Sequence, residues 1–544
     1  KFIMVSMLIT SSIPLSMSIY MLLTNTFISI NIPLMNMLST NISTDIMMDW
    51  MSLMFLSTVM LISSLIIMFS VYYIPKKEHK LFITLLMMFI LSMGILIISN
   101  NIFLILLGWD GLGLSSYILV VYYQNYQSAA SGSITLLSNR IGDIMILLSI
   151  SMMMMISNWN FNMNEEFMKL PLIFLLIAAC SKSAQFPFSA WLPMAMAAPT
   201  PISALVHSST LVTAGVFILL RIMNYHPILM TTLMIISSAT AIYSSMSANW
   251  EQDMKKIIAL STLSQIAMMV FAISIGSIIL AFSHLIIHAL FKSTMFLCAG
   301  IMIHESSYQD MRMMGLNFSS LPLTTSILGI TSMALMGIPF MSGFFSKDAI
   351  IESLISIKPE SLMSIMMIMS IGMTASYSIR MSFFSNKQIM KSTPTLSNHS
   401  NSMCLIPILM MGPMAIISGT WMTWMLIPDQ LFLISTQLKL VIIITLTMGA
   451  TLGTILSFKS HKYISMGESS ISLWFTHFMS ISPMTITSPL MSLYSNNDKL
   501  WQEMYGPQKM FITSKMMSIL PDSSKSMLMM ITIMMTIIPP MFIL

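Results

Sequence analysis

Three ionisable residues stand in line within the apolar stretch AFSHLIIHALFKSTMF. His284, His288 and Lys292 are spaced four residues apart, so a helix places all three along one face. Imidazole and amine groups in a row can pass a proton through hydrogen-bonded water. A zinc site is the rival interpretation, because two histidines at this spacing can bind zinc, but the HExxH glutamate is missing. Either histidine alone would be read as a hydrogen-bonded core residue, and the full row favours proton transfer.

Other ionisable residues interrupt five further apolar stretches. They are Asp110 in LLGWDGLGLSS, Arg140 and Asp143 in SNRIGDIMILL, Lys182 in CSKSAQFPFSAWLP, His207 in PTPISALVHSSTLVTAG, and Lys347 and Asp348 in GIPFMSGFFSKDAII. Each charge at mid-bilayer costs about 2.5–3.5 kcal/mol on the insertion scale, so several would not all face lipid. We expect them to face protein or trapped water and to form a proton or ion path.

The two pairs of neighbouring charged residues have different expected partners. Arg140 and Asp143 are three residues apart, so they can form a local pair that merely neutralises both charges, or they can act directly in the path. Lys347 and Asp348 are adjacent and point in different directions on a helix, so Lys347 needs another partner. Arg221 lies near a predicted membrane edge, where we expect it to anchor the helix.

The elements that position these residues are membrane helices. The chain has 544 residues, of which 56% are hydrophobic and only 8% charged, against about 25% charged in soluble domains. Apolar runs of about 20 residues recur, the length that crosses a bilayer. The fold class is therefore an all-α polytopic membrane protein. A net charge of +5 without basic, aromatic-interleaved stretches argues against nucleic acid, and three distant cysteines argue against an iron–sulfur cluster or disulfides.

We predict about fifteen membrane segments. They run over roughly 2–23, 51–73, 81–99, 101–122, 131–156, 170–197, 199–222, 228–248, 255–276, 277–304, 321–356, 361–384, 402–427, 433–457 and 526–544. Residues 24–50 are polar and predict an extended external loop or hairpin. If the segments alternate sides, most loop lysines fall on one side, which places the N-terminus on that positive side.

Two segments, 170–197 and 321–356, are longer than one span needs. Each contains a proline, Pro187 or Pro339, which removes a backbone donor within the membrane and frees a carbonyl. Such breaks are tolerated where protein or a water-filled cavity satisfies the freed groups. Each broken segment is the fourth of five in its half of the chain. An odd number of segments inverts the second copy, so we predict two inverted five-helix repeats.

The stretches quoted above resemble the chain 5 family of NADH–ubiquinone oxidoreductase, the distal antiporter-like subunits of mitochondrial respiratory complex I. The motif DMKKIIALSTLSQIAMM belongs to the same resemblance, which covers about 49–384. The abundance of methionine, 67 residues, is similar to that of animal mitochondrial proteins. The implied function is proton translocation coupled to NADH:ubiquinone electron transfer in other subunits.

The resemblance assigns roles by position. Asp110 matches the family's membrane carboxylate, Lys182 its partner on the first broken helix, and Asp143 an aspartate near the uptake route. The central hydrophilic axis corresponds to His207, His284, His288 and Lys292, and the lysine on the second broken helix to Lys347. The implied gating is electrostatic: Lys182 holds a proton while Asp110 is close and loses it when they separate.

Two departures from the family pattern stand out. Asp110 replaces the usual glutamate and is one methylene shorter, so its reach to Lys182 decides whether a gating contact forms. Two unit charges about 4 Å apart interact by about 4 kcal/mol at an effective dielectric constant near 20. Only one segment precedes the motif DWMSLMF, where the family usually has a further helix.

The domain boundaries that we expect follow from these segments. They are N-terminal helices with an external loop (1–80), a first antiporter-like repeat (81–222), a second repeat (228–384), two further membrane helices (402–457), a lateral segment along neighbouring antiporter-like subunits (458–525) and a C-terminal anchor helix (526–544).

The resemblance also implies the cofactors, partners and location. No cofactor or metal is expected in this chain, and FMN, iron–sulfur clusters and ubiquinone are expected in other subunits. The expected partners are other complex I membrane subunits and lipids including cardiolipin. The expected location is the mitochondrial inner membrane, with the N-terminus on the matrix side. Two alternatives remain open: a stand-alone cation/proton antiporter subunit, and a structural clamp, which predicts a dry core.

Overall fold

A computed structural model describes most of the chain. The described residues are 2–37, 40–156, 159, 169–222, 227–314, 321–357, 362–385, 402–426, 436–458, 464–471, 476–498, 504–519, 529 and 531. The chain divides into two compact units, Lys1–Trp474 and Phe475–Leu544.

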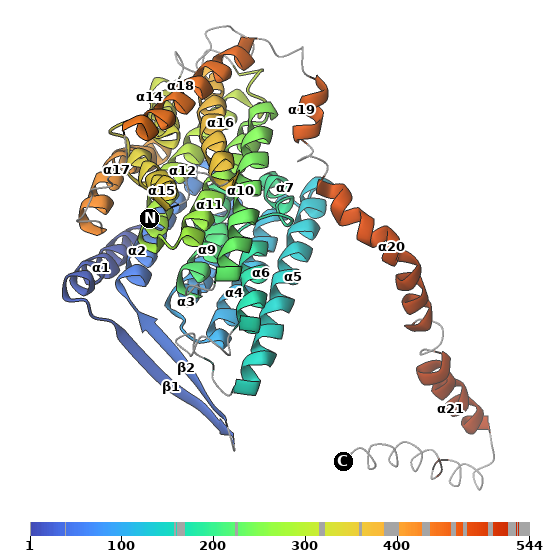
Figure 1. The fold of residues 1–544 in the computed structure, drawn as a ribbon. Coiled ribbons are helices and arrows are strands. Elements are labelled where there is room, and N and C mark those ends of the chain that lie inside the picture. The colour runs from blue at the N-terminus through green and yellow to red at the C-terminus, as the bar shows by residue number, and fades with distance from the viewer. Residues whose placement is uncertain are drawn as a thin grey trace. The chain divides into compact units, whose positions relative to one another are not determined.

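The first unit is a bundle of membrane-length helices (Figure 1). Twelve helices in the described part of the chain are long and apolar enough to cross a membrane. One of them is composite and consists of α8 (Thr200–Ile202), the π-helix η3 (Ser203–Thr210) and α9 (Leu211–Ile222). The others are α1 (Phe2–Thr24), α2 (Trp50–Tyr73), α3 (His79–Ile98, preceded by η1, Lys76–Glu78), α4 (Ile102–Val120), α5 (Tyr126–Ile156), α10 (Pro227–Trp250), α11 (Met254–Ile275), α12 (Ile278–Ser306), α16 (Leu362–Ser385), α17 (Ser402–Leu426) and α18 (Thr436–Phe458).

The two segments that were predicted to be broken are broken in the structure. The first consists of α6 (Lys169–Lys182), α7 (Trp191–Met194) and η2 (Ala195–Ala197), and the second of α14 (Pro322–Met336) and α15 (Ser342–Ile357). In the second segment, Gly337 ends α14 with φ +83° and donates its N–H to the Met333 and Ala334 carbonyls at 3.2 Å each. Glycine suits this left-handed position because it has no Cβ.

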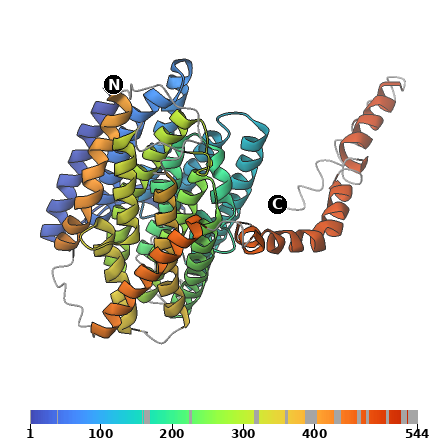
Figure 2. The ribbon, with the colours of Figure 1, turned by 90° about the horizontal axis from the view of Figure 1, so that it is seen from above.

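The polar stretch after α1 forms a β-hairpin, so the all-α expectation omits one small sheet. Strands β1 (Ile28–Met37) and β2 (Thr40–Met48) pair antiparallel, with an irregularity at Pro33/Met35. The link between α3 and α4 holds β2: Ile46 bridges to Ser99, and the Asn100 N–H donates to the Asp45 carbonyl at 3.0 Å. The hairpin therefore lies at the α3–α4 link, as segment alternation requires (Figure 1). Figure 2 shows the helix bundle from above.

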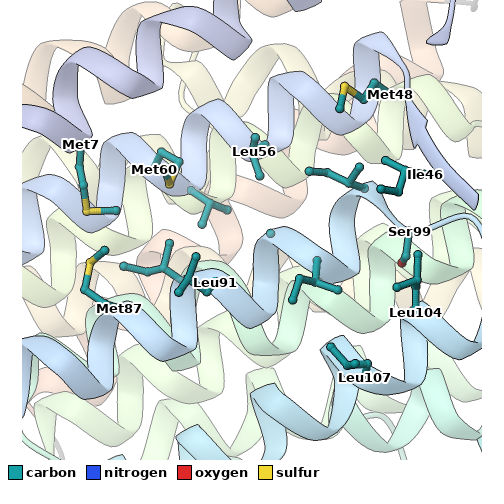
Figure 3. Close-up of a pocket in the computed structure, with 15 residues that line it drawn as sticks. Met7, Ile46, Met48, Leu56, Met60, Met87, Leu91, Ser99, Leu104 and Leu107 are labelled. Atoms are coloured by element: carbon teal, nitrogen blue, oxygen red, sulfur yellow. The ribbon is translucent and has the colours of Figure 1, made fainter. Parts of the chain in front are cut away.

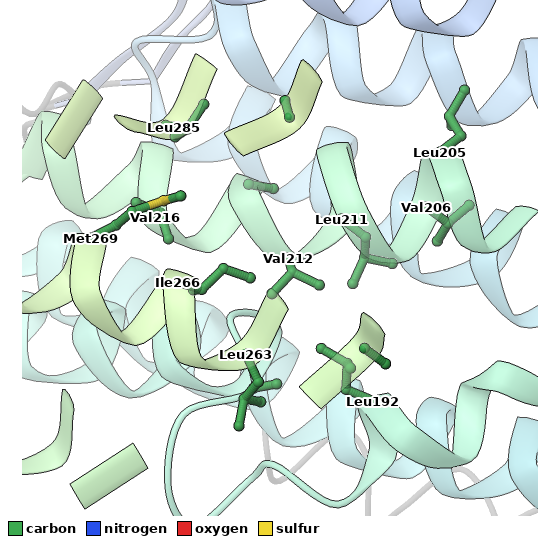
Figure 4. Packing of buried hydrophobic residues seen from close by; sticks show 14 of the residues in the cluster. Leu192, Leu205, Val206, Leu211, Val212, Val216, Leu263, Ile266, Met269 and Leu285 are labelled. Carbon is green, nitrogen blue, oxygen red and sulfur yellow. The ribbon is translucent and has the colours of Figure 1, made fainter. Parts of the chain in front are cut away.

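The helices that carry His207, His284, His288 and Lys292 are among the innermost ones. The most apolar 18-residue window of the composite span, of α11 and of α12 is completely buried, whereas in α1 only 17% of the window is buried. Figure 4 shows apolar side chains of these inner helices in contact, among them Val212, Ile266 and Leu285. This packing keeps the histidines and lysines of the inner helices away from lipid.

An apolar cavity of about 470 Å³ lies among α1, α2, α3, α4 and β2. Methionine, leucine and isoleucine side chains form most of its wall, and Ser99 is its one hydroxyl-bearing lining residue (Figure 3). Its lining residues include no titratable side chain, so it does not belong to a proton path.

Helices α16 and α18 touch through their backbones. A Cβ added at Gly449 would lie 2.0 Å from the Gly372 carbonyl oxygen, and one at Gly453 would lie 2.4 Å from that of Ser376. Gly449 and Gly453 are four residues apart, the small-residue spacing that allows close helix approach in membranes.

We expect Gly449→Ala to weaken this contact by about 1–3 kcal/mol, the usual penalty of overpacking. The amount of assembled membrane complex on a native gel measures the effect, and it should fall several-fold. Gly329→Ala is the matched control, because a Cβ there meets nothing within 4 Å. Equal amounts of complex for both variants would contradict the prediction.

The expected lateral segment is helical where it is described, and it is divided between the units. Helix α19 (Ile464–Ile471) belongs to the first unit, where a Cβ on Gly467 would lie 3.1 Å from Trp250. The second unit contains α20 (Thr476–Asn496), η5 (Met504–Gln508) and α21 (Lys509–Ile519). The predicted anchor helix at 526–544 lies outside the described residues except at 529 and 531.

Candidate proton pathway

Lys182 is the last residue of α6 and is completely buried. Its Nζ donates to the Trp109 carbonyl of α4 at 2.7 Å and lies 3.9 Å from the centroid of the Trp109 ring. A cation at the C-terminal end of a helix is stabilised by the unpaired carbonyls and the helix dipole. The break thus provides a polar position for Lys182 inside the membrane.

Asp110 faces Arg140 and forms no ion pair with Lys182 in the described structure. The Asp110 Oδ1 lies 3.8 Å from an Arg140 terminal nitrogen, and the same nitrogen donates to the Asp143 Oδ2 at 3.0 Å. The local pair of Arg140 and Asp143 is confirmed, and Arg140 is shared by two carboxylates. Both carboxylates still interact electrostatically with Lys182, without a direct ion pair among the described residues.

His207 lies in the π-helix η3 and is buried. Its ring centroid is 6.4 Å from that of Trp191, on the far side of the first break. Within the described part of the chain, neither ring nitrogen has a hydrogen-bond partner. The π-helix is rare and often occurs at functional sites.

The row on α12 is buried and shares one face, as its spacing predicted. The ring centroids of His284 and His288 are 6.2 Å apart. The His284 Nδ1 shares a hydrogen bond of 2.8 Å with the Ser346 Oγ of α15, and the Lys292 Nζ donates to the Ser261 Oγ of α11. Both ring nitrogens of His288 are buried without a partner among the described groups. The row therefore connects the inner helices to the second broken segment.

Lys347 occupies the second break. Its Nζ donates to the Thr374 Oγ1 at 2.8 Å, to the Met336 carbonyl at 3.4 Å and to the Leu335 carbonyl at 3.5 Å. The two carbonyls belong to the last residues of α14, so both breaks place a lysine ammonium at the end of a half-helix. Asp348 points elsewhere, into a cavity beside α18.

Sequence reasoning missed two buried cations. Arg380 donates to the Glu251 carbonyl at 2.6 Å and also to the Asn249 carbonyl, and the Lys255 Nζ donates to the Ala198 carbonyl at 3.2 Å. The structure places Lys255 in the buried first turn of α11. Both residues lie near helix ends, where cations are common, so the sequence gives no signal of their burial.

Arg221 lies in the last turn of α9 and contacts the neighbouring helix ends. It donates to the Ser99 carbonyl at 2.9 Å and lies 3.8 Å from the Asp49 carboxylate before α2. Burial raises the pKa of the Asp49 carboxyl, and the nearby Arg221 charge opposes that shift. Within the described ranges, no group of three or more His, Cys, Asp or Glu side chains could hold a metal ion.

The fold is that of antiporter-like membrane subunits. Residues 99–374 match the family model described as NADH:quinone oxidoreductase/Mrp antiporter, TM, and residues 377–544 match NADH dehydrogenase subunit 5 C-terminus. The chain is 42% identical to NADH-ubiquinone oxidoreductase chain 5 of Locusta migratoria, over 85% of each chain. It is 40% identical to that of Lumbricus terrestris, over 94% of this chain and 92% of the relative. The chain therefore belongs to the NADH-ubiquinone oxidoreductase chain 5 family.

A solved structure supports the fold. The Mrp complex from Dietzia sp. DQ12-45-1b contains a chain that superposes with a TM-score of 0.74 at 19% identity. The match covers 94% of this chain and 59% of that one.

Proposed function

We propose that this chain is a proton-translocating membrane subunit of respiratory complex I in the mitochondrial inner membrane. One observation carries the proposal: buried ionisable groups extend over the inner helices from one broken segment to the other. Several such groups inside a membrane are tolerated where they serve an ion or proton path. Membership in the chain 5 family supports the assignment to complex I.

The proposed path begins at Asp110, Asp143 and Lys182 and ends at Lys347, with Arg140 as the counter-charge of the two carboxylates. Between them the proton passes His207 and then the α12 row with Lys292. The hydrogen bond between His284 and Ser346, the residue before Lys347, supports the last transfer. Buried polar groups normally have protein or water partners, so the free imidazole nitrogens of His207 and His288 are where we place bridging water.

The finer architecture remains part of the proposal. We infer two inverted repeats within 81–222 and 228–384, about fifteen spans in all, and an N-terminus on the matrix side. The domain boundaries 402–457, 458–525 and 526–544 complete this division. The equivalent positions of the two lysine-bearing breaks support the repeats.

The proposed partners are the other membrane subunits of the complex. We infer that the lateral segment contacts neighbouring antiporter-like subunits and that lipids including cardiolipin bind the membrane surface. FMN, iron–sulfur clusters and ubiquinone belong to other subunits in this scheme. The match of 377–544 to the subunit 5 C-terminus favours complex I over a stand-alone antiporter.

We expect Lys292→Met to lower proton flux through this chain roughly 100-fold or more, as loss of an essential acid–base group does. The measurement is protons moved per NADH oxidised by the assembled complex in sealed vesicles. Lys256→Met is the control, because Lys256 forms a partly exposed pair with Asp253 at 3.2 Å outside the path. An unchanged ratio for Lys292→Met would favour the structural-clamp alternative, as would a water-resolving map with a dry core.

A further inference from the structure

A groove of about 690 Å³ lies between the first turns of α3 and the end of α4. The β-hairpin is held at the α3–α4 link, so the groove, at the opposite ends of these two helices, lies on the other side of the membrane. Lys77 lines its outer end and Leu85 its inner end. These residues are about 12 Å apart along the helix, at a rise of about 1.5 Å per residue. The groove therefore follows the helices into the membrane.

The outer end of the groove carries an uncompensated positive charge. Residues 76–80 contain three lysines (Lys76, Lys77 and Lys80) and one acidic residue (Glu78), so three positive charges less one negative charge leave +2. In the described part of the chain, none of these lysines forms an ion pair. The Glu78 carboxylate accepts a hydrogen bond from the Tyr122 hydroxyl at 2.6 Å instead. The Lys77 ammonium is therefore available to an anion in the groove.

Tyrosine hydroxyls line the groove beside this charge. Tyr117 and Tyr123 belong to the lining, and neither hydroxyl has a hydrogen-bond partner among the described residues. The ring of Tyr122 is fixed between neighbours, with its centroid 5.5 Å from that of Phe82 and 5.7 Å from that of Tyr123. A phenol hydroxyl can donate to a phosphate oxygen, and tyrosine is typical of the membrane–water interface. Lysine and tyrosine together therefore suit a phosphate at the level of the lipid headgroups.

The inner part of the groove is apolar and opens at the surface of the bundle. Leu81 of α3 is 59% exposed and Ile118 of α4 is 48% exposed, and both line the groove together with Leu85. A soluble phosphate compound would leave this apolar surface in contact with water, which is unfavourable. A neutral lipid would leave the Lys77 charge without a partner. The occupant that satisfies both parts has an anionic head and an apolar tail.

We propose that the groove binds one anionic phospholipid from the membrane leaflet opposite the β-hairpin. The lipid phosphate contacts the Lys77 ammonium and a tyrosine hydroxyl of the groove, and one acyl chain lies against Leu81 and Ile118. The bound lipid thereby joins the start of α3 to the end of α4, the helix that carries Asp110. This inference rests on the lipid partners proposed above and gives one of them a position, and it does not depend on proton translocation.

Photo-crosslinking of the assembled complex tests the site. The complex is reconstituted in phosphatidylcholine vesicles that contain a small share of phosphatidylglycerol with a photoreactive group on one acyl chain, and proteolysis locates the labelled peptides. We expect label within 81–85 and 117–121, the apolar walls of the groove. Unlabelled phosphatidylglycerol should compete with the probe, and additional phosphatidylcholine should not. Equal competition by both lipids would show an unselective boundary lipid and would overturn the proposal.

Two lysines of the same stretch separate a bound headgroup from diffuse attraction to the membrane. Lys77→Met should lower the labelling about tenfold or more, as loss of a hydrogen bond to a charged group does. Lys80→Met removes the same charge from a residue that does not line the groove. Its effect should stay below about fivefold, the size of diffuse attraction per lysine at an anionic surface. Equal losses in both variants would refute a specific site.

A second pair of variants tests the apolar part of the groove. Ile118→Trp fills the inner end and should lower the labelling several-fold while Lys77 is intact. Leu114→Trp is the matched control, because Leu114 lies one turn away on α4, is 49% exposed and does not line the groove. Displacement of the probe by inorganic phosphate, with no effect of Ile118→Trp, would show a soluble-anion site and would overturn the phospholipid.

The anionic lipid that co-purifies with the complex separates the site from the lipid partnership on which it rests. Bound anionic lipid without label in the groove would refute the site and leave the proposed lipid partners intact. A complex that carries no anionic lipid after purification in a mild detergent, and that shows no label, would refute both.

Discussion

Replacing Lys182 with alanine should stop proton translocation through this chain. The Lys182 ammonium is the group at the end of α6 that both donates to the Trp109 carbonyl and can release a proton. Loss of an essential acid–base group typically slows a reaction by about 100-fold to 10,000-fold. Protons moved per NADH oxidised, measured in sealed vesicles that contain the assembled complex, report the effect.

A second variant separates charge from proton exchange. Arginine keeps its charge and does not release its proton, so Lys182→Arg should preserve the amount of complex and still lose translocation. Full stoichiometry in Lys182→Ala would remove this residue from the path. Full stoichiometry in Lys182→Arg alone would assign it an electrostatic role without proton exchange.

Arg380→Met should reduce the stability of the bundle by several kcal/mol. The guanidinium donates to carbonyls at the end of α10 and in the following loop, including that of Glu251 at 2.6 Å. Each buried acceptor left without a partner costs about 1–3 kcal/mol, and the variant removes donors from more than one. The midpoint temperature at which the assembled complex loses activity measures the loss.

Arg312→Met is the matched control for Arg380. Arg312 pairs with Asp310 at 2.6 Å, but its side chain is 54% exposed. Exposed pairs contribute about 0–1 kcal/mol, so this variant should stay close to the unmodified complex. If both variants lowered the midpoint temperature equally, the buried hydrogen bonds of Arg380 would contribute no more to stability than the exposed Arg312 pair.

Local patterns predicted much of the fold and of the candidate site. The two prolines within long apolar segments marked both breaks, and the four-residue spacing placed His284, His288 and Lys292 on one buried face. The polar stretch before Asp49 predicted an extended loop or a hairpin, and a hairpin forms there. These features depend on helix period, segment length and proline chemistry, which are properties of a short stretch of chain.

Local sequence patterns did not predict the contacts between helices. The partner of Asp110 depends on how α4 and α5 are rotated about their axes, and that rotation is set by packing around both helices. The burial of Arg380 and Lys255 depends on loops that fold over helix ends. The cavity that Asp348 lines arises where α15 and α18, distant in sequence, leave space between them.

The hydrogen bonds of Lys347 couple its protonation to the relative position of two half-helices. The Lys347 ammonium holds the Leu335 and Met336 carbonyls of α14 from its own position on α15. A displacement that pulls the two half-helices apart removes these acceptors and favours release of the proton. By thermodynamic reciprocity, release of the proton favours the displacement to the same extent. In the proposed path, the second break would therefore couple a displacement of α14 against α15 to release of the Lys347 proton.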